Sequence, residues 1–456
     1  LKGDRLRQII RLALAIAVLS ASGVTNASDL GRLPAGVWRT DGYGYIFETD
    51  GKKLTIFDET KAACIFDIQL DGREADDYIA AAELNEGGSQ ALLHAGISRI
   101  AVARLPNLPQ RCKLRPSDPD PLLNFDILWE TFDEHYAFFA ERKIDWKTMR
   151  ADFRPKAAAA RSPDELFDVM SAMLAPLKDA HVQLTAGEKE FQAERSPAPT
   201  NPDADGLIST RKALQKALKN YITSPSTPLL SPAAGAGRNR IWYGRLAPDI
   251  GYIAVFAMGG FEDDDVNSDD NAASARKTFQ EIATKLAGVS GVVVDLRYNQ
   301  GGHDPVSLAL AGLFAEHPGI AFKKSARGAA MKPYAVMLNP SAPARLVVPV
   351  AVLISAHTVS AGESAATAFR TLSNAKLIGQ PTQGALSDTL SKTLPNGWTF
   401  TLSNEVFTNE DGASPEVVGV QPHIATPLPK PTSSSARFHP DVDEAVRWLK
   451  TTIRKN

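Results

Sequence analysis

The sequence has few cysteines, no excess of charge of one sign and no long apolar run in its main body. Only two of its 456 residues are cysteine, which excludes a disulfide-rich scaffold. The 50 Lys and Arg and 52 Asp and Glu give a net charge of −2. A charge this balanced lacks the basic stripe of a nucleic-acid-binding domain, so no nucleic-acid partner is expected. Apolar residues make up 44%, too many for a disordered chain, and the length suggests roughly three domains.

The one marked apolar run lies near the N-terminus. Residues 12–19 are apolar, follow the basic residues Lys2, Arg5, Arg7 and Arg11, and lead through small residues to Ala27. This order is typical of a secretory signal peptide, so we expect residues 1–27 to be removed and the protein to be periplasmic or secreted. The run is far shorter than the ~20 residues needed to cross a bilayer, so the mature chain should have no membrane span. An amphipathic N-terminal helix is the alternative.

Export would place Cys64 and Cys112 in an oxidising compartment, where two cysteines can pair. Both border one expected N-terminal unit, which makes them a disulfide candidate. Two separately buried thiols are the alternative.

The pattern of residues changes along the chain. Short strands separated by Asp-Gly and Gly-rich turns predict a small β-rich domain over residues 28–112. Helical periodicity then predicts a helical cap subdomain over 119–190, including a helix that Ser162 caps. Residues 191–240 are rich in Pro, Ala, Ser and Gly and are predicted to be a linker.

Residues 241–430 alternate between strands and helices. Strands are predicted at 252–256, 291–296, 350–354 and 375–379, and helices at 273–287, 305–314 and 360–372. Strand–loop–helix units in series predict an α/β core over residues 241–430. Residues 431–456 are expected to form a linker and a closing helix.

Two strand-to-helix junctions of this core are candidate sites, because helix N-termini present free N–H groups there. At the first junction, Gly301 and Gly302 follow the 291–296 strand and allow a close backbone approach. A simple turn is the alternative, and no G-x-G-x-x-G pattern suggests a dinucleotide cofactor. At the second, Ser360 begins a helix, where nearby N–H groups could stabilise an oxyanion. Ser360 could instead merely cap the helix.

A serine nucleophile needs a base, and three histidines are candidates. His181 lies just past a helix, His303 follows the Gly pair, and His357 precedes Ser360 by three residues. Any of them could equally be an ordinary surface or core histidine. No H-E-x-x-H or Cys/His spacing predicts a metal site, so neither a metal nor a cofactor is expected.

Four ordered motifs and one segment that precedes them resemble a known family. DLRYNQGG at 295–302 is followed by TVSAGE at 358–363 and LIGQPTQG at 377–384, an arrangement similar to the tail-specific, or C-terminal processing, serine peptidases. EVVGVQP at 416–422 resembles the closing segment of their tricorn-core relatives, and LKDAH at 177–181 their leading helical subdomain. The resemblance covers residues 125–430. It implies a ClpP/crotonase-like α/β core with a helical cap.

The resemblance also implies roles for individual residues. Ser360 matches the nucleophile, and Gly302 and Ala361 match the backbone N–H donors of the oxyanion hole. The bacterial processing branch uses a Ser/Lys dyad, but its lysine position holds Ala385 here. The tricorn-like branch uses Ser, His and Glu, which implies His181 as the base and Glu416 as its orienter.

The chain departs from the tricorn pattern in two ways. Ala180 stands where the tricorn core has a serine before its histidine, and His423 replaces the closing aspartate. The stretch between His181 and the core shows no β-sandwich pattern, so the peptide-tethering PDZ-like domain of many relatives is expected to be missing.

The sequence therefore predicts an exported serine peptidase that acts on peptides or proteins, without predicting its cleavage preference or assembly state. A catalytically silent module on the same fold, like the retinoid-binding relatives, is the main alternative. An esterase is a third, disfavoured because no G-x-S-x-G motif is present.

Overall fold

The computed structural model describes residues 30–79, 81–113, 120–193, 215–216, 218–220, 222–223, 229–230, 233–263, 268–341, 343–426 and 440–454. Contacts divide the chain into two units. Unit 1 holds residues 1–196, 324–334 and 387–406, and unit 2 holds residues 197–323, 335–386 and 407–456. The expected signal peptide and much of the expected 191–240 linker lie outside the described residues.

Unit 1 contains a seven-stranded antiparallel sheet in the order β4-β3-β2-β1-β7-β6-β5. Its strands are β1 (Gly36–Thr40), β2 (Tyr45–Thr49), β3 (Lys53–Glu59), β4 (Cys64–Asp71), β5 (Ala82–Leu84), β6 (Gln90–Ala95) and β7 (Ser98–Leu105), with α2 (Arg73–Ile79) after β4. Trp38, Phe47 and Ile56 lie opposite one another in the register and all enter the main core. Directly opposite residues on neighbouring strands point to the same face of a sheet, so these three side chains are buried on one face.

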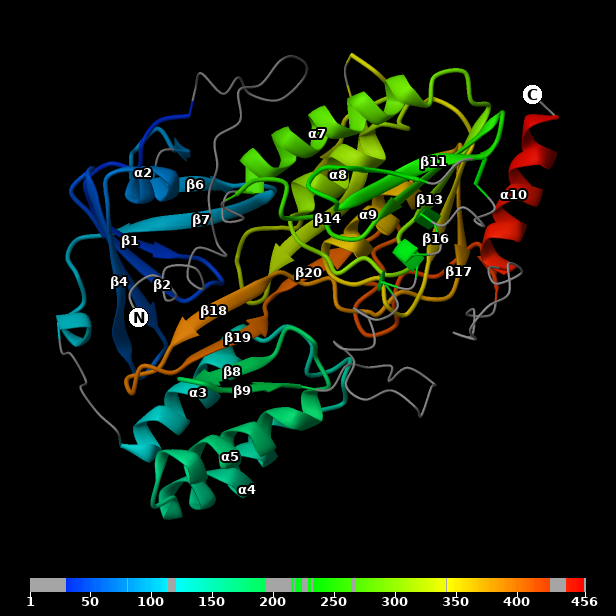
Figure 1. Cartoon of the computed structure of the whole chain (residues 1–456). Coiled ribbons are helices and arrows are strands. Elements are labelled where there is room, and N and C mark those ends of the chain that lie inside the picture. The colour runs from blue at the N-terminus through cyan, green and yellow to red at the C-terminus, as the bar shows by residue number, and fades with distance from the viewer. Residues whose placement is uncertain are drawn as a thin grey trace. The chain divides into compact units, whose positions relative to one another are not determined.

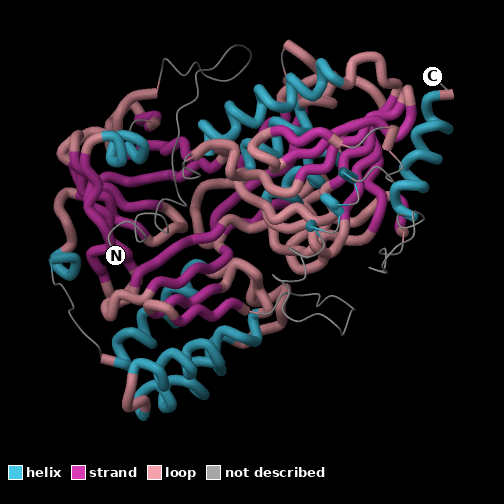
Figure 2. The backbone as a smooth tube through the Cα atoms, in the orientation of Figure 1, coloured by secondary structure: helices cyan, strands magenta, loops and turns pink. Residues whose placement is uncertain are grey.

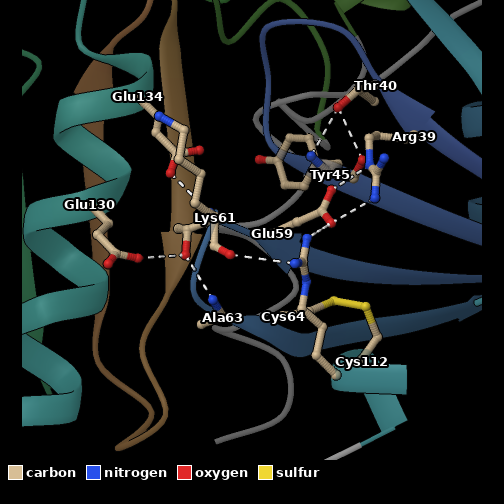
Figure 3. A network of polar contacts seen from close by, with 12 residues as sticks. Arg39, Thr40, Tyr45, Glu59, Lys61, Ala63, Cys64, Cys112, Glu130 and Glu134 are labelled. Atoms are coloured by element: carbon tan, nitrogen blue, oxygen red, sulfur yellow. Dashed lines mark hydrogen bonds and ion pairs between the residues drawn. A yellow bond between two sulfur atoms is a disulfide. The ribbon is translucent and has the colours of Figure 1, made fainter. Parts of the chain in front are cut away.

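The disulfide candidate is bonded in the structure. Cys64 of β4 joins Cys112 of the 3₁₀ helix η3 (Gln110–Lys113) beside a polar network (Figure 3). In this network Arg39 donates from Nε to Glu59 at 2.7 Å, and Arg111 also pairs with Glu59. These contacts and the disulfide fasten η3 to the β3–β4 hairpin.

Three helices and a second sheet complete unit 1. The helices are α3 (Pro121–His135), α4 (Trp146–Ala159) and α5 (Pro163–Leu174), followed by the 3₁₀ helix η4 (Ala175–Leu177). The predicted cap of α5 is confirmed, since the Ser162 hydroxyl accepts the Glu165 N–H at 3.2 Å. The sheet has the order β18-β19-β8-β9, with β8 (Gln183–Ala186), β9 (Lys189–Gln192), β18 (Thr389–Thr393) and β19 (Thr399–Ser403). Phe132 of α3 stacks on Phe400 of β19.

Unit 2 is built on a seven-stranded sheet in the order β10-β11-β12-β13-β16-β17-β21 (Figures 1 and 2). Its strands are β10 (Ala234–Ala236), β11 (Ile241–Ala247), β12 (Ile250–Val255), β13 (Gly291–Asp295), β16 (Val350–Ile354), β17 (Ala375–Gly379) and β21 (Ile424–Ala425). From β12 to β21 neighbouring strands are parallel. The helices are α7 (Ser268–Lys285), α8 (Asp304–Gly312), α9 (Ala361–Arg370) and α10 (Pro440–Ile453). The predicted α/β core is therefore confirmed.

The chain passes between the units within β14 (Gly319–Ala326), β15 (Tyr334–Leu338) and β20 (Glu405–Thr408), which form a sheet in the order β15-β14-β20. Contacts thus assign 324–334 and 387–406 to unit 1, although no pattern in these residues indicates that they leave the core. Residues 387–406 belong to unit 1 because β18 and β19 pair with each other and β19 pairs with β8. The predicted domain boundaries stay a prediction. No helix among the described residues is long and apolar enough to cross a membrane.

Candidate active site

Ser360 lies at the junction of β16 and α9 in a strained backbone conformation. Its φ is 54° and its ψ is −128°. An ordinary N-cap residue has β-region angles, and an L-residue at positive φ costs roughly 1–2 kcal/mol. Helix capping alone does not require this geometry. Strain of this kind gathers at functional sites, where surrounding contacts hold it in place.

The glycine pair after β13 packs directly against Ser360. A Cβ atom on Gly301 would lie 2.7 Å from the Ser360 Cβ, and one on Gly302 would lie 2.4 Å from the Met258 carbonyl carbon. Both positions have positive φ, 84° and 139°. The loop is held from both sides: Met258 donates its N–H to the Gly301 carbonyl at 2.7 Å, and Gly301 donates to Asn299 Oδ1 at 2.9 Å. Only glycine fits this close approach without displacing the backbone.

The two expected oxyanion donors both lie in this part of unit 2. Ala361 is the first residue of α9, where N–H groups have no partner within the helix. Within the described part of the chain, no acceptor lies on the N–H of either Gly302 or Ala361. Free N–H groups on both sides of a serine can hold a developing negative charge.

A buried carboxylate that the sequence did not single out fixes the surroundings of Ser360. Glu363, fully buried in α9, accepts N–H groups from Ser360 at 3.2 Å, Gly384 at 2.7 Å and Ala385 at 2.9 Å. It also accepts the Thr382 hydroxyl at 2.6 Å. Burial raises the pKa of Glu363 to about 7, against the lowering effect of these hydrogen bonds. Glu363 thus ties the serine loop to the 382–385 loop.

Glu416 contacts the residue that follows that second loop. Its side chain is buried and accepts the Leu386 N–H at 2.8 Å, while Ala385, the preceding residue, accepts the Ser360 N–H at 3.1 Å. Val417 follows with a φ of 71°, a rare conformation for a β-branched residue. Ser360 and Glu416 are therefore linked through two consecutive residues in unit 2.

Ala385 occupies the position where the Ser/Lys branch of the resembled family has its lysine. It is buried, and its N–H and carbonyl both hydrogen-bond beside Ser360, the N–H to Glu363 and the carbonyl to the Ser360 N–H. A methyl group cannot accept a proton. Ala385 therefore offers no basic group to Ser360.

His181 lies in unit 1, in a tightly held turn. Asp179 accepts the His181 N–H at 2.9 Å and the Tyr136 hydroxyl at 2.8 Å, and it pairs with Arg142 at 3.4 Å. Thr401 donates its hydroxyl to the His181 carbonyl at 2.6 Å. These two hydrogen bonds fix the backbone of His181.

The other two histidine candidates lie in unit 2. His357 is buried, with its ring packed on Tyr298 at 5.8 Å, as expected of a core histidine. His303 precedes α8, and its N–H donates to the Met258 carbonyl at 2.8 Å. Among the described residues, no group of three or more His, Cys, Asp and Glu side chains is placed to hold a metal ion.

The 295–302 motif also holds the core together, through the charged side chains of Asp295 and Arg297. Arg297 pairs with Asp295 of β13 and with Asp441 of α10, and Tyr252 of β12 donates to Asp295 at 2.7 Å. Burial would raise the pKa of Asp295, but the charge and hydrogen bonds of Arg297 outweigh it and lower the pKa. This buried network holds the closing helix on the sheet that carries the site.

Two family models match parts of the chain. Residues 249–426 match the family model described as peptidase family S41, and residues 120–175 match the tricorn protease C1 domain. Residues 249–426 form an S41 peptidase domain. The predicted family is confirmed.

Similar proteins include the nisin-resistance protein of Lactococcus lactis subsp. lactis, 25% identical over 197 residues, which are 41% of this chain and 58% of that protein. The match thus spans a little over half of that relative. Among solved structures, a candidate peptidase from Parabacteroides merdae has a TM-score of 0.59 at 23% identity, covering 73% of this chain and 97% of the other. The CPAF s499a mutant has a TM-score of 0.51 at 12% identity, covering 74% and 98%. At these identities the structures establish the S41 fold alone.

Sequence reasoning missed Glu363 and Asp179 as site residues. Residues 360–363 read S-x-x-E, the pattern of a helix capping box. This pattern predicts that the Glu363 carboxylate contacts the backbone of Ser360. Its contacts with Thr382 and Gly384 had no signal in the sequence, because they depend on how two distant loops meet.

Proposed function

We propose that this S41 chain is an exported serine peptidase that hydrolyses peptide bonds in peptides or proteins. Ser360 is the nucleophile, His181 the general base and Glu416 its orienter, with an oxyanion hole from the N–H groups of Gly302 and Ala361. The observation that carries the proposal is the strained Ser360, with Gly301 packed against it and free N–H groups beside it.

In the proposed reaction His181 takes the Ser360 hydroxyl proton while Oγ attacks the carbonyl carbon of the scissile bond. The carbonyl oxygen becomes negative and accepts the two backbone N–H groups, each worth roughly 2.7–4 kcal/mol in related sites. His181 then gives the proton to the departing amine. Water, activated by the same base, releases the acyl group and restores Ser360.

The histidine base is supported by what replaces the lysine of the dyad branch. Ala385 contacts the Ser360 backbone but offers no basic group. The Asp179 turn is compatible with the same role for His181, since Asp179 holds the residue through its backbone N–H. The N-terminal basic, apolar and small-residue pattern supports export, and fractionation of the expressing cells would test it.

The decisive experiment is labelling with a fluorophosphonate, which reacts with activated serines. We expect the wild type to be labelled, and Ser360→Ala and His181→Gln to be unlabelled while folded. An unlabelled wild type would favour a silent ligand-binding module on this fold. If the wild type is labelled, digestion of a peptide library by unlabelled wild-type protein would then give the cleavage preference.

A further inference from the structure

A helical segment of unit 2 lies within the stretch whose composition is typical of a linker. Its described residues are 215–216, 218–220 and 222–223. Leu218 and Ile222 are buried in the core cluster that also holds Phe256 and Tyr298. Gln215 precedes them by three and seven residues, so the three share one face of the helix, which packs on the core. Nothing in the proposed reaction uses this segment.

The Gln215 side chain connects two loops of the core. Its Nε2 donates to the Tyr298 carbonyl at 2.5 Å and to the Phe256 carbonyl at 3.1 Å. Its Oε1 accepts the side-chain amide of Gln300 at 2.8 Å. Phe256 directly follows β12, and Tyr298 lies three residues past β13. One side chain therefore ties together the segments that leave two neighbouring parallel strands.

Both segments lead directly into the glycine loop beside Ser360. The Phe256 carbonyl also accepts the Gln300 N–H at 3.0 Å, and Gly301 is the next residue. Two residues past Phe256, Met258 donates its N–H to the Gly301 carbonyl at 2.7 Å. The proposed oxyanion donor, the N–H of Gly302, therefore follows a short stretch that is fastened through Met258 and through Gln300.

The glycine loop depends on such contacts for its shape. Gly301 and Gly302 have φ of 84° and 139°, and a glycine has no Cβ that would restrict it to these angles. Neighbouring hydrogen bonds must therefore fix the direction of the Gly302 N–H. Donors that already point at the developing charge stabilise a transition state without the cost of reorienting. Gln215 is uncharged, so its effect on the site is through this geometry.

We propose that Gln215 is a positioning residue for the oxyanion hole: it holds the Tyr298 and Phe256 carbonyls and the Gln300 side chain, and thereby fixes the direction of the Gly302 N–H. This inference rests on the proposed function. It gives a stretch with the composition of a linker a part in the reaction. A change at Gln215 should slow bond formation at the serine and leave the binding of a probe unchanged.

The test is fluorophosphonate labelling of the full chain at several probe concentrations. These data separate kinact, the rate constant of bond formation, from KI, the probe concentration that gives half of that rate. The phosphoryl oxygen of the probe takes the place of the substrate oxygen, so its reaction needs the same donors. Gln215→Met keeps the length of the side chain and removes its hydrogen bonds. We expect kinact to fall about 10–100-fold while KI stays within about twofold.

Thr223→Val is the matched control in the same helix. It removes the hydrogen bond from the Thr223 hydroxyl to the Lys219 carbonyl, 2.8 Å long, which lies within the helix itself. Both kinact and KI should stay at the wild-type values. Circular dichroism establishes that each variant is folded, and Gln215→Ala replaces Gln215→Met if the latter does not fold.

A second variant tests whether the donated hydrogen bonds matter, or only the volume of the side chain. Gln215→Glu keeps the size of glutamine, but an ionised carboxylate donates no hydrogen bond, whereas a protonated carboxyl donates one. The ratio of its kinact to that of Gln215→Met at the same pH should therefore rise as the pH is lowered from about 8 to about 5. Taking the ratio at one pH removes the titration of His181 from the comparison.

The outcomes separate this inference from the proposed function. A labelled wild type whose kinact is unchanged in folded Gln215→Met overturns this inference alone. A change confined to KI, or a Gln215→Glu ratio that stays level with pH, does the same. A wild type that is unlabelled at every probe concentration overturns the proposed function, and this inference with it.

Discussion

Replacing Gly301 by alanine tests whether the glycine loop determines the position of the proposed nucleophile. The new Cβ would lie 2.7 Å from the Ser360 Cβ and 2.9 Å from the Val359 carbonyl oxygen, at a φ of 84°. Real side chains avoid such distances, so either Ser360 or the loop must shift. Gly288 is a matched control, since it has a φ of 82° with nothing within 4 Å of an added Cβ.

The two variants share the cost of positive φ and differ only in available space. Gly288→Ala should lower the free energy of unfolding by about 1 kcal/mol, because about 1–2 kcal/mol of left-handed strain is offset by about 0.4–1 kcal/mol from the unfolded state. Gly301→Ala adds overpacking of roughly 1–3 kcal/mol, for a total of about 2–4 kcal/mol.

Activity should separate the variants more sharply than stability. A displacement of about 1 Å at a reacting group costs on the order of 100-fold in rate. Under conditions where both variants are folded by circular dichroism, fluorophosphonate labelling should fall about 100-fold for Gly301→Ala and stay near wild type for Gly288→Ala. Equal labelling of the two variants would refute the idea that Gly301 positions Ser360.

Three further predictions follow from the packing and charges. Replacing Cys64 and Cys112 by alanine should lower the free energy of unfolding by about 4 kcal/mol, as expected for opening a loop with a sequence separation of 48. Denaturation with and without reductant measures this loss, and a wild type whose stability does not change with reductant would contradict the prediction. Arg297→Met should cost about 3–5 kcal/mol in urea denaturation, because it leaves Asp295 buried without its cation, and a cost below about 1 kcal/mol would show that the network is not needed. Burial raises the pKa of Glu363 to about 7, so the folded state binds more protons than the unfolded state between about pH 4.5 and 7. The free energy of unfolding should therefore fall as pH rises through this window. Glu363→Gln should remove the part of this pH dependence that Glu363 causes. An unchanged slope would mean that Glu363 does not titrate in this range.

The sequence predicted the elements of the core well because their signals are local. β16 and β17 lie where apolar runs at 350–354 and 375–379 placed them, and Ser162 caps its helix as its residue type indicates. The resemblance on four motifs led to the right family. In each case the deciding information lies within a few neighbouring residues.

Long-range contacts carried no comparable signal. Nothing in residues 387–406 indicates that β18 and β19 pair with β8, since strand partners are set by the whole fold. The positive φ of Ser360 was also hidden, because serine is an ordinary cap residue and the strain depends on the packing of Gly301. The convergence of four donors on Glu363 arises in the same way, from two loops that meet only in the folded chain.

The most direct test of the account is to identify the residue that the fluorophosphonate modifies. Wild-type protein is labelled, digested and analysed by mass spectrometry, with Ser360→Ala treated in parallel. The account predicts one adduct on Ser360, absent from the variant. Labelling that persists in Ser360→Ala, or an adduct on another residue, would contradict the assignment of Ser360 as the nucleophile.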